Sequence, residues 1–512
     1  MKKILMTLAA VLCCAMTMTV FTACSENSDN PAPQPESEQL AEYTILYYAH
    51  GGGDLDKYAL QMIADFYKAN PDAYKKVNVV VQYKFSKPQN ITELKYSFDA
   101  FSEDFGNKTI RWAIDPAKTF MEQASSQDNI YGADNADITC PDSLTNFINW
   151  AAKAYPAKKY MLIMNDHGRG YVPHDELPEI PATTRGMIYD KGNKDKHFTA
   201  KSFHRAVANA NVRFETIYLL ACLMNNLEYQ FEIQDLCDYV IASTYTMPAW
   251  GGALYDLPEI LSQPNVDIER ALDAYCKADV ASWDITYSVE GGYPEGYPFY
   301  SDLTVTRTAN IAHLGEMMRQ FTDRLCNTYS NGTERQKEII DSCTAHAVKV
   351  QSEYPYYDVA KYMSSIIKAL PEVYGDDFFN QMKETFNSCI VAQNYSKYLT
   401  VHDYMVDYSV MLGTGGNYSL IKQVFAKPFI EIEHCADGSL IQYSMIRSND
   451  GTYYRGEPLE EGDKFWGSTL ADTYEQLAFD RAVGWSRWLR LNHQLPDNLS
   501  PSDMHYELPM PE

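Results

Sequence analysis

The chain has 512 residues, too many for one average domain, so its length favours two or three compact units with sizeable cores. Apolar residues make up 46% and charged residues 22%, which is ordinary for a soluble globular protein, although 39 tyrosines are unusually many. The formal net charge of -25 and the lack of clustered Lys and Arg argue against nucleic acid as a partner, because phosphate backbones are bound through such clusters.

Residues 1–24 have the order of a lipoprotein signal peptide. Lys2 and Lys3 precede an apolar run from Ile4 to Ala23, and the small Ala23 stands directly before Cys24. We therefore expect cleavage before Cys24, lipidation of this cysteine, and a cell-envelope location at the outer membrane or cell surface of a Gram-negative bacterium. The apolar run is 20 residues long, so a permanent transmembrane anchor is the alternative.

Residues 25–42 have the composition of a flexible acidic linker. They contain five acidic residues, three prolines and no aromatic residue. Such a segment buries too little apolar surface to fold and is expected to act as an extended tether. Its early acidic residues also resemble the export tags that send some lipoproteins to the cell surface, and both interpretations stay open.

Eight cysteines remain once Cys13, Cys14 and Cys24 are set aside. They stand at positions 140, 222, 237, 276, 326, 343, 389 and 435, widely spaced and without a CxxC pair. This spacing argues against a structural zinc site, while an even number outside the cytoplasm permits disulfides. If one thiol is a nucleophile, at least one other cysteine is also free or bridges to another molecule.

From residue 43 to about 260, short apolar runs alternate with amphipathic stretches, a pattern that predicts an α/β fold with a parallel sheet and crossover helices. The expected strands are Thr44–Tyr48, Val77–Tyr83, Ile110–Ile114, Tyr160–Met164, Thr216–Leu220 and Tyr239–Ala242. Helices are expected around Leu144, Phe147, Ile148 and Ala151, from Thr199 through Ala210, and after Cys222 through Leu223, Leu227 and Phe231. Residues 169–198 lack periodicity and predict a long loop over one edge of the sheet.

Beyond about residue 300 the pattern changes to longer helical stretches. We place a boundary there between an α/β domain (43–300) and a mostly helical C-terminal region (301–512), with strands expected at Phe429–His434 and Leu440–Met445. The segment Leu477–Leu489 predicts a closing amphipathic helix, and its Trp485 and Trp488 are expected in the core.

Two apolar runs end in residues that carry chemistry. Asp166, His167 and Gly168 follow one expected strand, and Ala221 and Cys222 follow the next. Ligands of open parallel sheets bind beyond the carboxyl ends of the strands. The interval of 55 residues between His167 and Cys222 holds a loop and one crossover helix, so the two strands can be neighbours.

An imidazole beside a thiol predicts nucleophilic catalysis. His167 would accept the proton of Cys222, the thiolate would attack a carbonyl, and the imidazolium would donate to the leaving amine. The backbone N–H groups of Gly168 and Cys222 are candidates to bind the oxyanion. The alternative is that Cys222, between apolar neighbours, is only a buried small hydrophobic residue.

At these residues the sequence resembles the clostripain family, relatives of caspases, legumains and gingipains. The resemblance rests on His167-Gly168, on Ala221-Cys222-Leu223-Met224, on Asn146-Phe147-Ile148-Asn149-Trp150, on Glu228, on Val240-Ile241-Ala242-Ser243 with Trp250-Gly251, and on the weaker Ser301-Asp302-Leu303, Tyr357-Asp358-Val359 and Trp485. It implies a caspase-like sheet over 43–300, endopeptidase activity by a His-Cys dyad on protein or peptide substrates, and in some members self-cleavage. No cofactor is required, and calcium is implied by the resemblance alone.

The sequence departs from the family pattern at the predicted substrate pocket. Members that cleave after Arg or Lys carry an acidic residue two positions before the nucleophile, where this chain has Leu220, and Glu after the next strand, where it has Thr244. We therefore expect a neutral pocket formed by Leu220 with Tyr245 and Trp250, unless an acidic residue of the 169–198 loop such as Asp190 supplies the charge.

Three further patterns have other interpretations. The glycine-rich turn His50-Gly51-Gly52-Gly53-Asp54 follows the first strand and predicts a tight turn, although His50 or Asp54 can line the cleft from there. His174, His197 and His204 with Asp175 and Asp190 fit no zinc spacing and are expected to be solvated loop residues. The alternative to an enzyme is a non-catalytic surface lipoprotein that binds peptides or glycans through its tyrosines.

Overall fold

The structure, a computed structural model, describes residues 40–52, 55–86, 105–168, 170–171, 186–193, 196–249, 253–289, 301–347, 357–396, 411–412, 430–434, 440–447, 453–458 and 477–492. Residues Leu40–Glu512 form one compact unit. The predicted signal peptide and almost all of the predicted linker lie outside the described residues. None of the described helices combines the length and the apolar composition needed to cross a bilayer.

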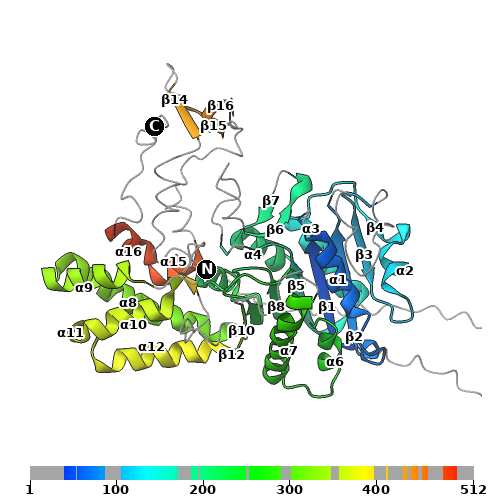
Figure 1. The fold of residues 1–512 in the computed structure, drawn as a ribbon, viewed down its shortest axis with the longest axis horizontal. Coiled ribbons are helices and arrows are strands. Elements are labelled where there is room, and N and C mark those ends of the chain that lie inside the picture. The colour runs from blue at the N-terminus through cyan, green and yellow to red at the C-terminus, as the bar shows by residue number, and fades with distance from the viewer. Residues whose placement is uncertain are drawn as a thin grey trace, which may run out of the picture. The chain divides into compact units, whose positions relative to one another are not determined.

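A nine-stranded sheet forms the centre of this unit (Figure 1). Its strands, in order across the sheet, are β12 (Ile390–Tyr395), β10 (Asp302–Arg307), β9 (Cys237–Ala242), β8 (Phe214–Leu220), β5 (Ala157–Asn165), β1 (Ala41–His50), β2 (Val77–Lys84), β3 (Thr109–Ala113) and β4 (Ile130–Tyr131). The five strands from β9 to β2 run parallel, and the two at each edge are antiparallel to their neighbours. All six strands expected from the sequence are present, and the α/β fold class is confirmed.

The expectation of a purely parallel sheet is wrong at one of the six strands. The strand predicted at Ile110–Ile114 is β3, and it pairs antiparallel with β2. An apolar run shows that a segment is buried on both faces, but it carries no information about the direction of the strand. The sheet is therefore mixed, with its parallel strands in the middle.

Successive side chains of the central strands point to opposite faces of the sheet and contribute to two separate hydrophobic cores. Ile45 and Tyr47 of β1 pack with residues of α1 (Asp56–Phe66), α6 (Asp256–Leu261) and α7 (Ile268–Val289). Leu46 and Tyr48 pack with residues of α3 (Pro141–Ala154), α4 (Ala200–Ala208) and α5 (Leu227–Ile233). A short helix, α2 (Phe120–Ala124), follows β3. Because both faces are covered, the ends of the strands are the places where polar groups meet solvent.

The helices expected between residues 140 and 235 are present with one correction. The predicted apolar face of α3 is buried, and Thr199 caps α4 by accepting a hydrogen bond from the Ser202 N–H. The third helix does not begin at Cys222, because Leu223 has a φ of 63° and leaves the helical region. Instead α5 begins at Leu227 and is capped by Asn226.

The predicted 169–198 loop contains a small hairpin at its end. Strands β6 (Met187–Asp190) and β7 (Lys196–Phe198) pair antiparallel with a register shift between Met187 and Tyr189. Strands of four and three residues are too short to show an alternating pattern in the sequence, which is why the prediction of an irregular loop is wrong here.

The chain after residue 300 supplies most of a third, helical core. It contains α8 (Ile311–Asn331), α9 (Glu334–Ala345), α10 (Val359–Ala369), α11 (Pro371–Tyr374), α12 (Asp376–Cys389), α15 (Ala478–Val483) and α16 (Trp485–Leu491). The short strands β11 (Tyr357–Asp358) and β13 (Met411–Leu412) pair with each other, as do β14 (Ile430–His434), β15 (Leu440–Arg447) and β16 (Tyr453–Pro458). The strands predicted at Phe429–His434 and Leu440–Met445 are thereby confirmed.

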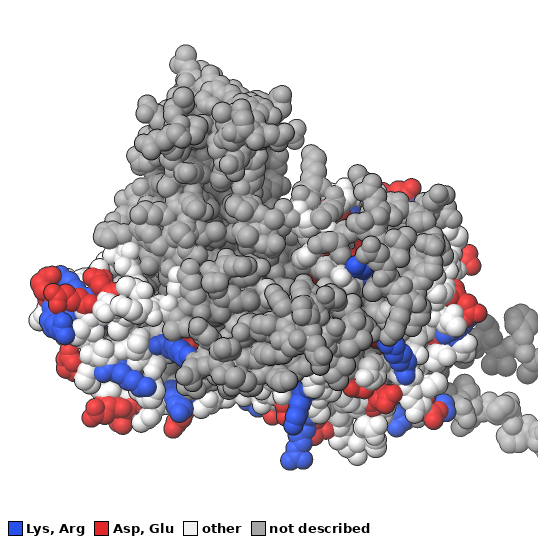
Figure 2. Space-filling view, viewed as in Figure 1, with Lys and Arg blue, Asp and Glu red and all other residues white. Residues whose placement is uncertain are grey.

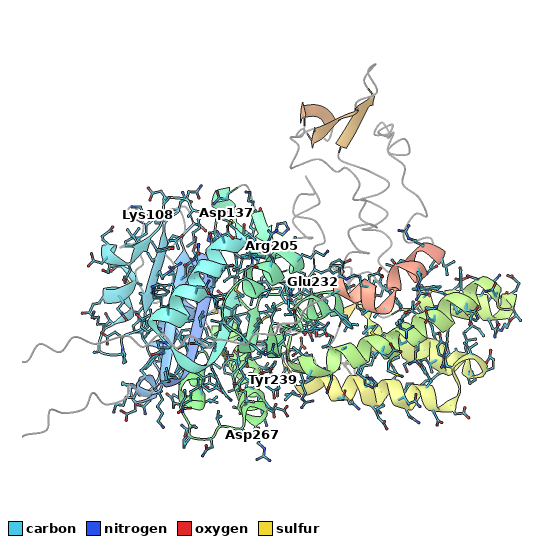
Figure 3. The ribbon with its side chains drawn as sticks, turned by 180° about the vertical axis from the view of Figure 1, so that it is seen from behind. Lys108, Asp137, Arg205, Glu232, Tyr239 and Asp267 are labelled. Carbon is cyan, nitrogen blue, oxygen red and sulfur yellow. The ribbon has the colours of Figure 1, made fainter. Side chains whose placement is uncertain are left out.

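The predicted closing helix is divided in two. Gly484, with a φ of +68°, separates α15 from α16, and Trp485 and Trp488 are buried as expected. Figure 3 labels Glu232 on α5, whose carboxylate accepts a hydrogen bond of 2.8 Å from the Ala478 N–H of α15. Since β10 and β12 also extend the central sheet, the change of pattern near residue 300 is a change of architecture inside one compact unit.

Candidate active site

His167 and Cys222 lie at the same edge of the sheet. Strands β5 and β8 are parallel neighbours with Asn165 opposite Leu220, and each candidate residue follows its strand end by two positions. Gly168 lies against the Cys222 turn so closely that a Cβ on it would come within 2.5 Å of the Cys222 carbonyl oxygen. Only glycine fits this approach. The pairing of β5 with β8 thus brings the two residues predicted to form the dyad to one edge, together with both predicted oxyanion donors, Gly168 and Cys222.

The turn at Cys222 presents its thiol at the end of β8. Leu223 has a φ of 63°, which is rare for a residue with a side chain, and its N–H donates to the Tyr245 carbonyl at 3.0 Å. The Met247 N–H lies 3.2 Å from Cys222 Sγ and donates to it. The Met247 carbonyl oxygen lies 3.8 Å from the same sulfur, so Met247 faces the thiol with both a donor and an acceptor.

Cys222 differs from the buried cysteines of the described chain. It is partly exposed, and none of the seven described cysteines forms a disulfide. Burial raises the pKa of the Cys326 and Cys389 thiols to about 11, and it raises the pKa of Cys237 and Cys276 as well. Those four thiols stay protonated at neutral pH, so they are poor nucleophiles.

The backbone around His167 is held by Asp166 and by strand β6. The Asp166 carboxylate accepts hydrogen bonds from the N–H groups of His167 (2.6 Å) and Tyr189 (2.8 Å), and the Ile188 N–H donates to the His167 carbonyl (3.2 Å). Burial raises the pKa of Asp166 to about 6. Ile188 has a φ of 57°, which is costly for a β-branched residue and shows that β6 is forced into this position by its surroundings.

A buried ion pair connects β6 to strand β2 of the central sheet. Lys84 Nζ on β2 lies 2.6 Å from Asp190 Oδ2, and both side chains are fully buried. The same carboxylate oxygen accepts from the Ile138 N–H at 3.1 Å. Asp190 is therefore committed to Lys84, and it does not supply the acidic pocket residue that the sequence left open.

The glycine-rich turn after β1 reaches the candidate histidine. Gly52 has a φ of +53°, and a Cβ on it would lie 2.9 Å from Asp166 Oδ1 and 3.0 Å from His167 Cδ2. His50 is fully buried, with Nδ1 2.7 Å from the Lys84 carbonyl oxygen, so it does not line an open cleft. Asp54 lies outside the described residues. The sequence predicted the turn, but it gave no sign that Gly52 would touch the imidazole.

The predicted pocket residues are close to Cys222 but little exposed. Leu220 is 4%, Thr244 1% and Tyr245 3% exposed, while Trp250 lies outside the described residues. The Thr244 N–H and hydroxyl both donate to Asp302. Asp302 was noted in the sequence only as a weak element of the family resemblance, and its role as an acceptor was missed.

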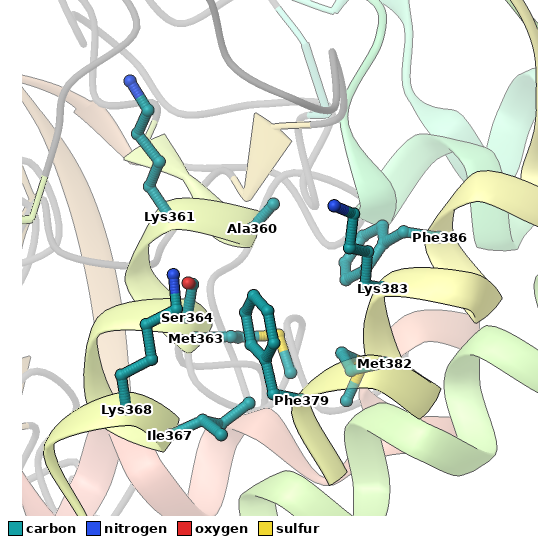
Figure 4. A pocket seen from close by; sticks show the side chains of 10 residues that line it. All are labelled: Ala360, Lys361, Met363, Ser364, Ile367, Lys368, Phe379, Met382, Lys383 and Phe386. Carbon is teal, nitrogen blue, oxygen red and sulfur yellow. The ribbon is translucent and has the colours of Figure 1, made fainter. Parts of the chain in front are cut away.

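A separate groove lies in the helical region (Figure 4). It lies between α10 and α12 and is lined by the apolar Met363, Ile367 and Phe379 and by the basic Lys361, Lys368 and Lys383. Its lining residues all belong to α10 and α12. Across the described part of the face in Figure 2, acidic and basic side chains alternate without a continuous basic stripe.

Among the described candidates for a metal site, His197, His204 and Asp190 do not form a metal-binding group, and Asp190 is fully buried rather than solvated as expected. His204 lies 3.1 Å from Asp235, and His174 and Asp175 lie outside the described residues. Within the described ranges, no group of three or more His, Cys, Asp or Glu side chains is arranged to hold a metal ion.

Comparison with known proteins agrees with this geometry. The profile of the clostripain family matches residues 47–437. The chain belongs to the clostripain family. Clostripain from Hathewaya histolytica is 26% identical over 226 residues, which cover 42% of this chain and 40% of that protein. The chain thus matches less than half of the length of this curated relative.

Solved structures support the fold of this clostripain-family chain. A secreted C11 cysteine protease from Bacteroides thetaiotaomicron, solved with an irreversible peptide inhibitor, superposes with a TM-score of 0.53 at 15% identity over 87% of this chain and 99% of that one. Another from the same organism, called iotapain, gives a TM-score of 0.50 at 16% identity over 75% and 97%. At such identities the likeness concerns the fold alone.

Proposed function

We propose that the protein is a cysteine endopeptidase in which Cys222 is the nucleophile and His167 the general base. The observation that carries this proposal is the pairing of β5 with β8, which puts both residues two positions beyond neighbouring strand ends. Membership of the clostripain family and the partial exposure of Cys222 support it. Protein or peptide chains are the proposed substrates.

The chemistry follows from the two side chains. His167 takes the proton of the Cys222 thiol, and Sγ attacks the carbonyl carbon of the scissile bond. The resulting oxyanion is stabilised by the N–H groups proposed here, those of Gly168 and Cys222. The imidazolium then gives its proton to the leaving amine nitrogen, which leaves a thioester. Water, deprotonated by the neutral imidazole, attacks the thioester and regenerates the thiol and the acid product.

Two substitutions test the dyad. Cys222→Ala and His167→Ala should each lower peptide hydrolysis by several orders of magnitude, because each removes a group that the chemistry requires. Cys343→Ala is the matched control, since Cys343 is also a partly exposed free cysteine and lies in the helical region. Retained turnover in either dyad variant would overturn the assignment.

Alkylation separates an enzyme from the alternative of a non-catalytic binding lipoprotein. An activated Cys222 should react with iodoacetamide much faster in the wild type than in His167→Ala, because the histidine generates the thiolate. A binding protein has no reason to show this dependence. Among the tyrosines whose exposure the structure describes, Tyr131 alone is well exposed, which gives little support to a tyrosine-based binding surface.

We further propose a neutral pocket for the residue before the scissile bond. Leu220 replaces the acidic residue, Thr244 has its polar groups bonded to Asp302, and Asp190 is paired with Lys84. Burying a substrate guanidinium there would leave its charge unpaired, at a cost of several kcal/mol. A mixed peptide library should show cleavage after uncharged residues, and Leu220→Asp should shift cleavage towards Arg and Lys. A strong wild-type preference for Arg or Lys contradicts this pocket.

The location is also a proposal. The signal pattern before Cys24 supports a lipid-anchored protein of the cell envelope, and the structural relatives are described as secreted. The Cys24→Ala variant should lose the acyl anchor and leave the membrane fraction. Mature wild-type protein that keeps Met1 would instead support a transmembrane anchor.

A further inference from the structure

Asp302 reaches the candidate active site because its strand runs against the others. Strand β10 is antiparallel to β9, and Thr304 lies opposite Ala242. The beginning of β10 therefore lies at the same edge of the sheet as the ends of the parallel strands. Asp302, two positions before Thr304, lies opposite Thr244, two positions beyond Ala242.

The Asp302 carboxylate is fully buried and accepts four hydrogen bonds. Oδ1 accepts from the Thr244 N–H (2.7 Å) and the Ser243 hydroxyl (3.1 Å), and Oδ2 accepts from the hydroxyls of Thr244 (3.1 Å) and Thr304 (2.9 Å). Three of the four donors thus belong to two consecutive residues. A buried carboxylate is expensive unless such donors surround it, so the bonds fix both the carboxylate and the turn.

Ser243 and Thr244, which Asp302 binds, are also hydrogen-bonded to Asn225, three residues after Cys222. The Asn225 N–H donates to the Ser243 carbonyl at 2.9 Å, and the Asn225 side-chain amide donates to the Thr244 hydroxyl at 3.1 Å. The same segment ends with the Met247 N–H on Cys222 Sγ. Residues 243–247 therefore connect Asp302 to the sulfur through backbone contacts.

We propose that Asp302 is a positioning residue which sets segment 243–247 and, through it, the Met247 N–H on Cys222 and the wall of the substrate pocket. The inference rests on the proposed function and adds a residue that acts on Cys222 without touching it. Asp302→Asn is the informative change, because it replaces one acceptor oxygen by an NH₂ donor. With the amide oxygen of Asn towards the Thr244 N–H, its NH₂ faces the hydroxyls of Thr244 and Thr304, which must change from donors to acceptors. The negative charge that strengthens all four bonds is also lost.

The chain offers a matched control for buried carboxylates. Asp279 on α7 is also fully buried and accepts from Tyr218 (3.2 Å), Tyr275 (3.0 Å) and Trp283 (2.9 Å). Its donors are these three aromatic side chains and the Ala253 backbone N–H, and none of them belongs to the 243–247 segment. Asp279→Asn therefore reports what the loss of a buried carboxylate does to the protein in general.

The experiment compares Asp302→Asn, Thr304→Val and Asp279→Asn in the full chain. We expect Asp302→Asn to lower kcat/KM about 10- to 100-fold, mainly through KM, and to slow iodoacetamide alkylation of Cys222 by a similar factor. Thr304→Val keeps the three bonds to Ser243 and Thr244 and should stay within about threefold of wild type, as should Asp279→Asn. Thermal unfolding confirms that each variant is folded at the assay temperature.

Several results would overturn the inference. If Asp302→Asn folds and keeps the wild-type kcat/KM and alkylation rate, Asp302 does not determine the position of residues 243–247. Equal losses in Asp302→Asn and Asp279→Asn show a general effect of destabilisation. If Asp302→Asn does not fold, Ser243→Ala removes the hydroxyl that links Asp302 to Tyr245 within the segment, and it must then slow alkylation at least about threefold. Turnover that survives Cys222→Ala is a different result, because it overturns the proposed function itself.

Discussion

The strand-end edge around Cys222 and the helical core after residue 300 are held together by different contacts. At the edge, the buried carboxylates Asp166, Asp190 and Asp302 bind backbone N–H groups, and the backbone includes Leu223 and Ile188 at positive φ. In the helical core, large apolar side chains such as those of Trp485 and Trp488 are fully buried. The first region uses polar groups to fix an irregular backbone, and the second uses apolar burial to stabilise regular helices.

This difference predicts that substitutions at the edge around Cys222 lower activity, whereas substitutions in the helical core lower stability. Trp485→Ala should lower the free energy of unfolding by about 3–5 kcal/mol, because it leaves a cavity among the helices. The kcat/KM of the fraction that remains folded should not change. Denaturant unfolding and an assay at low temperature measure the two quantities separately. A loss of kcat/KM in fully folded protein would show that the two regions are coupled.

A pair of glycine substitutions sharpens the comparison. Gly52 and Gly375 both have positive φ, but a Cβ on Gly52 meets Asp166 and His167, whereas a Cβ on Gly375 meets nothing within 4 Å. Gly52→Ala should therefore displace the imidazole and lower kcat/KM on the order of 100-fold. Gly375→Ala should lower stability by about 1–2 kcal/mol through its backbone strain and leave kcat/KM unchanged. Similar activity losses in both variants would contradict the assigned contact between Gly52 and His167.

The smallest expected effect is a pH-dependent change in the free energy of unfolding that arises from Asp279. Burial raises the pKa of Asp279 to about 6, above that of an unfolded aspartate at about 4. The folded state therefore binds the proton more tightly, so the stability from this group is complete below about pH 4 and is lost as pH rises to about 6. Between pH 4.5 and 6 the wild type should lose about 1–2 kcal/mol more than Asp279→Asn. Parallel stability curves for the two proteins would show that Asp279 does not titrate in this range.

Much of the fold followed from apolar runs, and the dyad followed from the residues after them. Cys222 and His167 were proposed because parallel strands place their carboxyl ends together, and β5 and β8 are parallel neighbours as that proposal requires. Asp302 was missed because its strand begins, rather than ends, at that edge. The sequence shows where an apolar run lies but not which way it runs.

Contacts between distant segments explain the other differences. Leu223 was placed in a helix because its spacing to Leu227 is helical, but the turn is bonded to Tyr245 and Met247 from another strand end. The sequence accounted for Gly52 by the tight turn it forms, but the structure also places it against His167. Such contacts arise only when the whole sheet has formed, so a local pattern does not contain them.

The two outermost strands of the sheet bear on how the protein behaves at high local concentration. Strand β4 has only two residues, and the Arg111 guanidinium lies 3.5 Å from the centre of its Tyr131 ring. At the other edge, β12 pairs with β10 across a register shift between Val305 and Thr306. Short or irregular edges offer few aligned backbone groups to a second molecule, so they oppose edge-to-edge aggregation. An engineered extension of β4 into a regular strand would remove that protection and promote self-association.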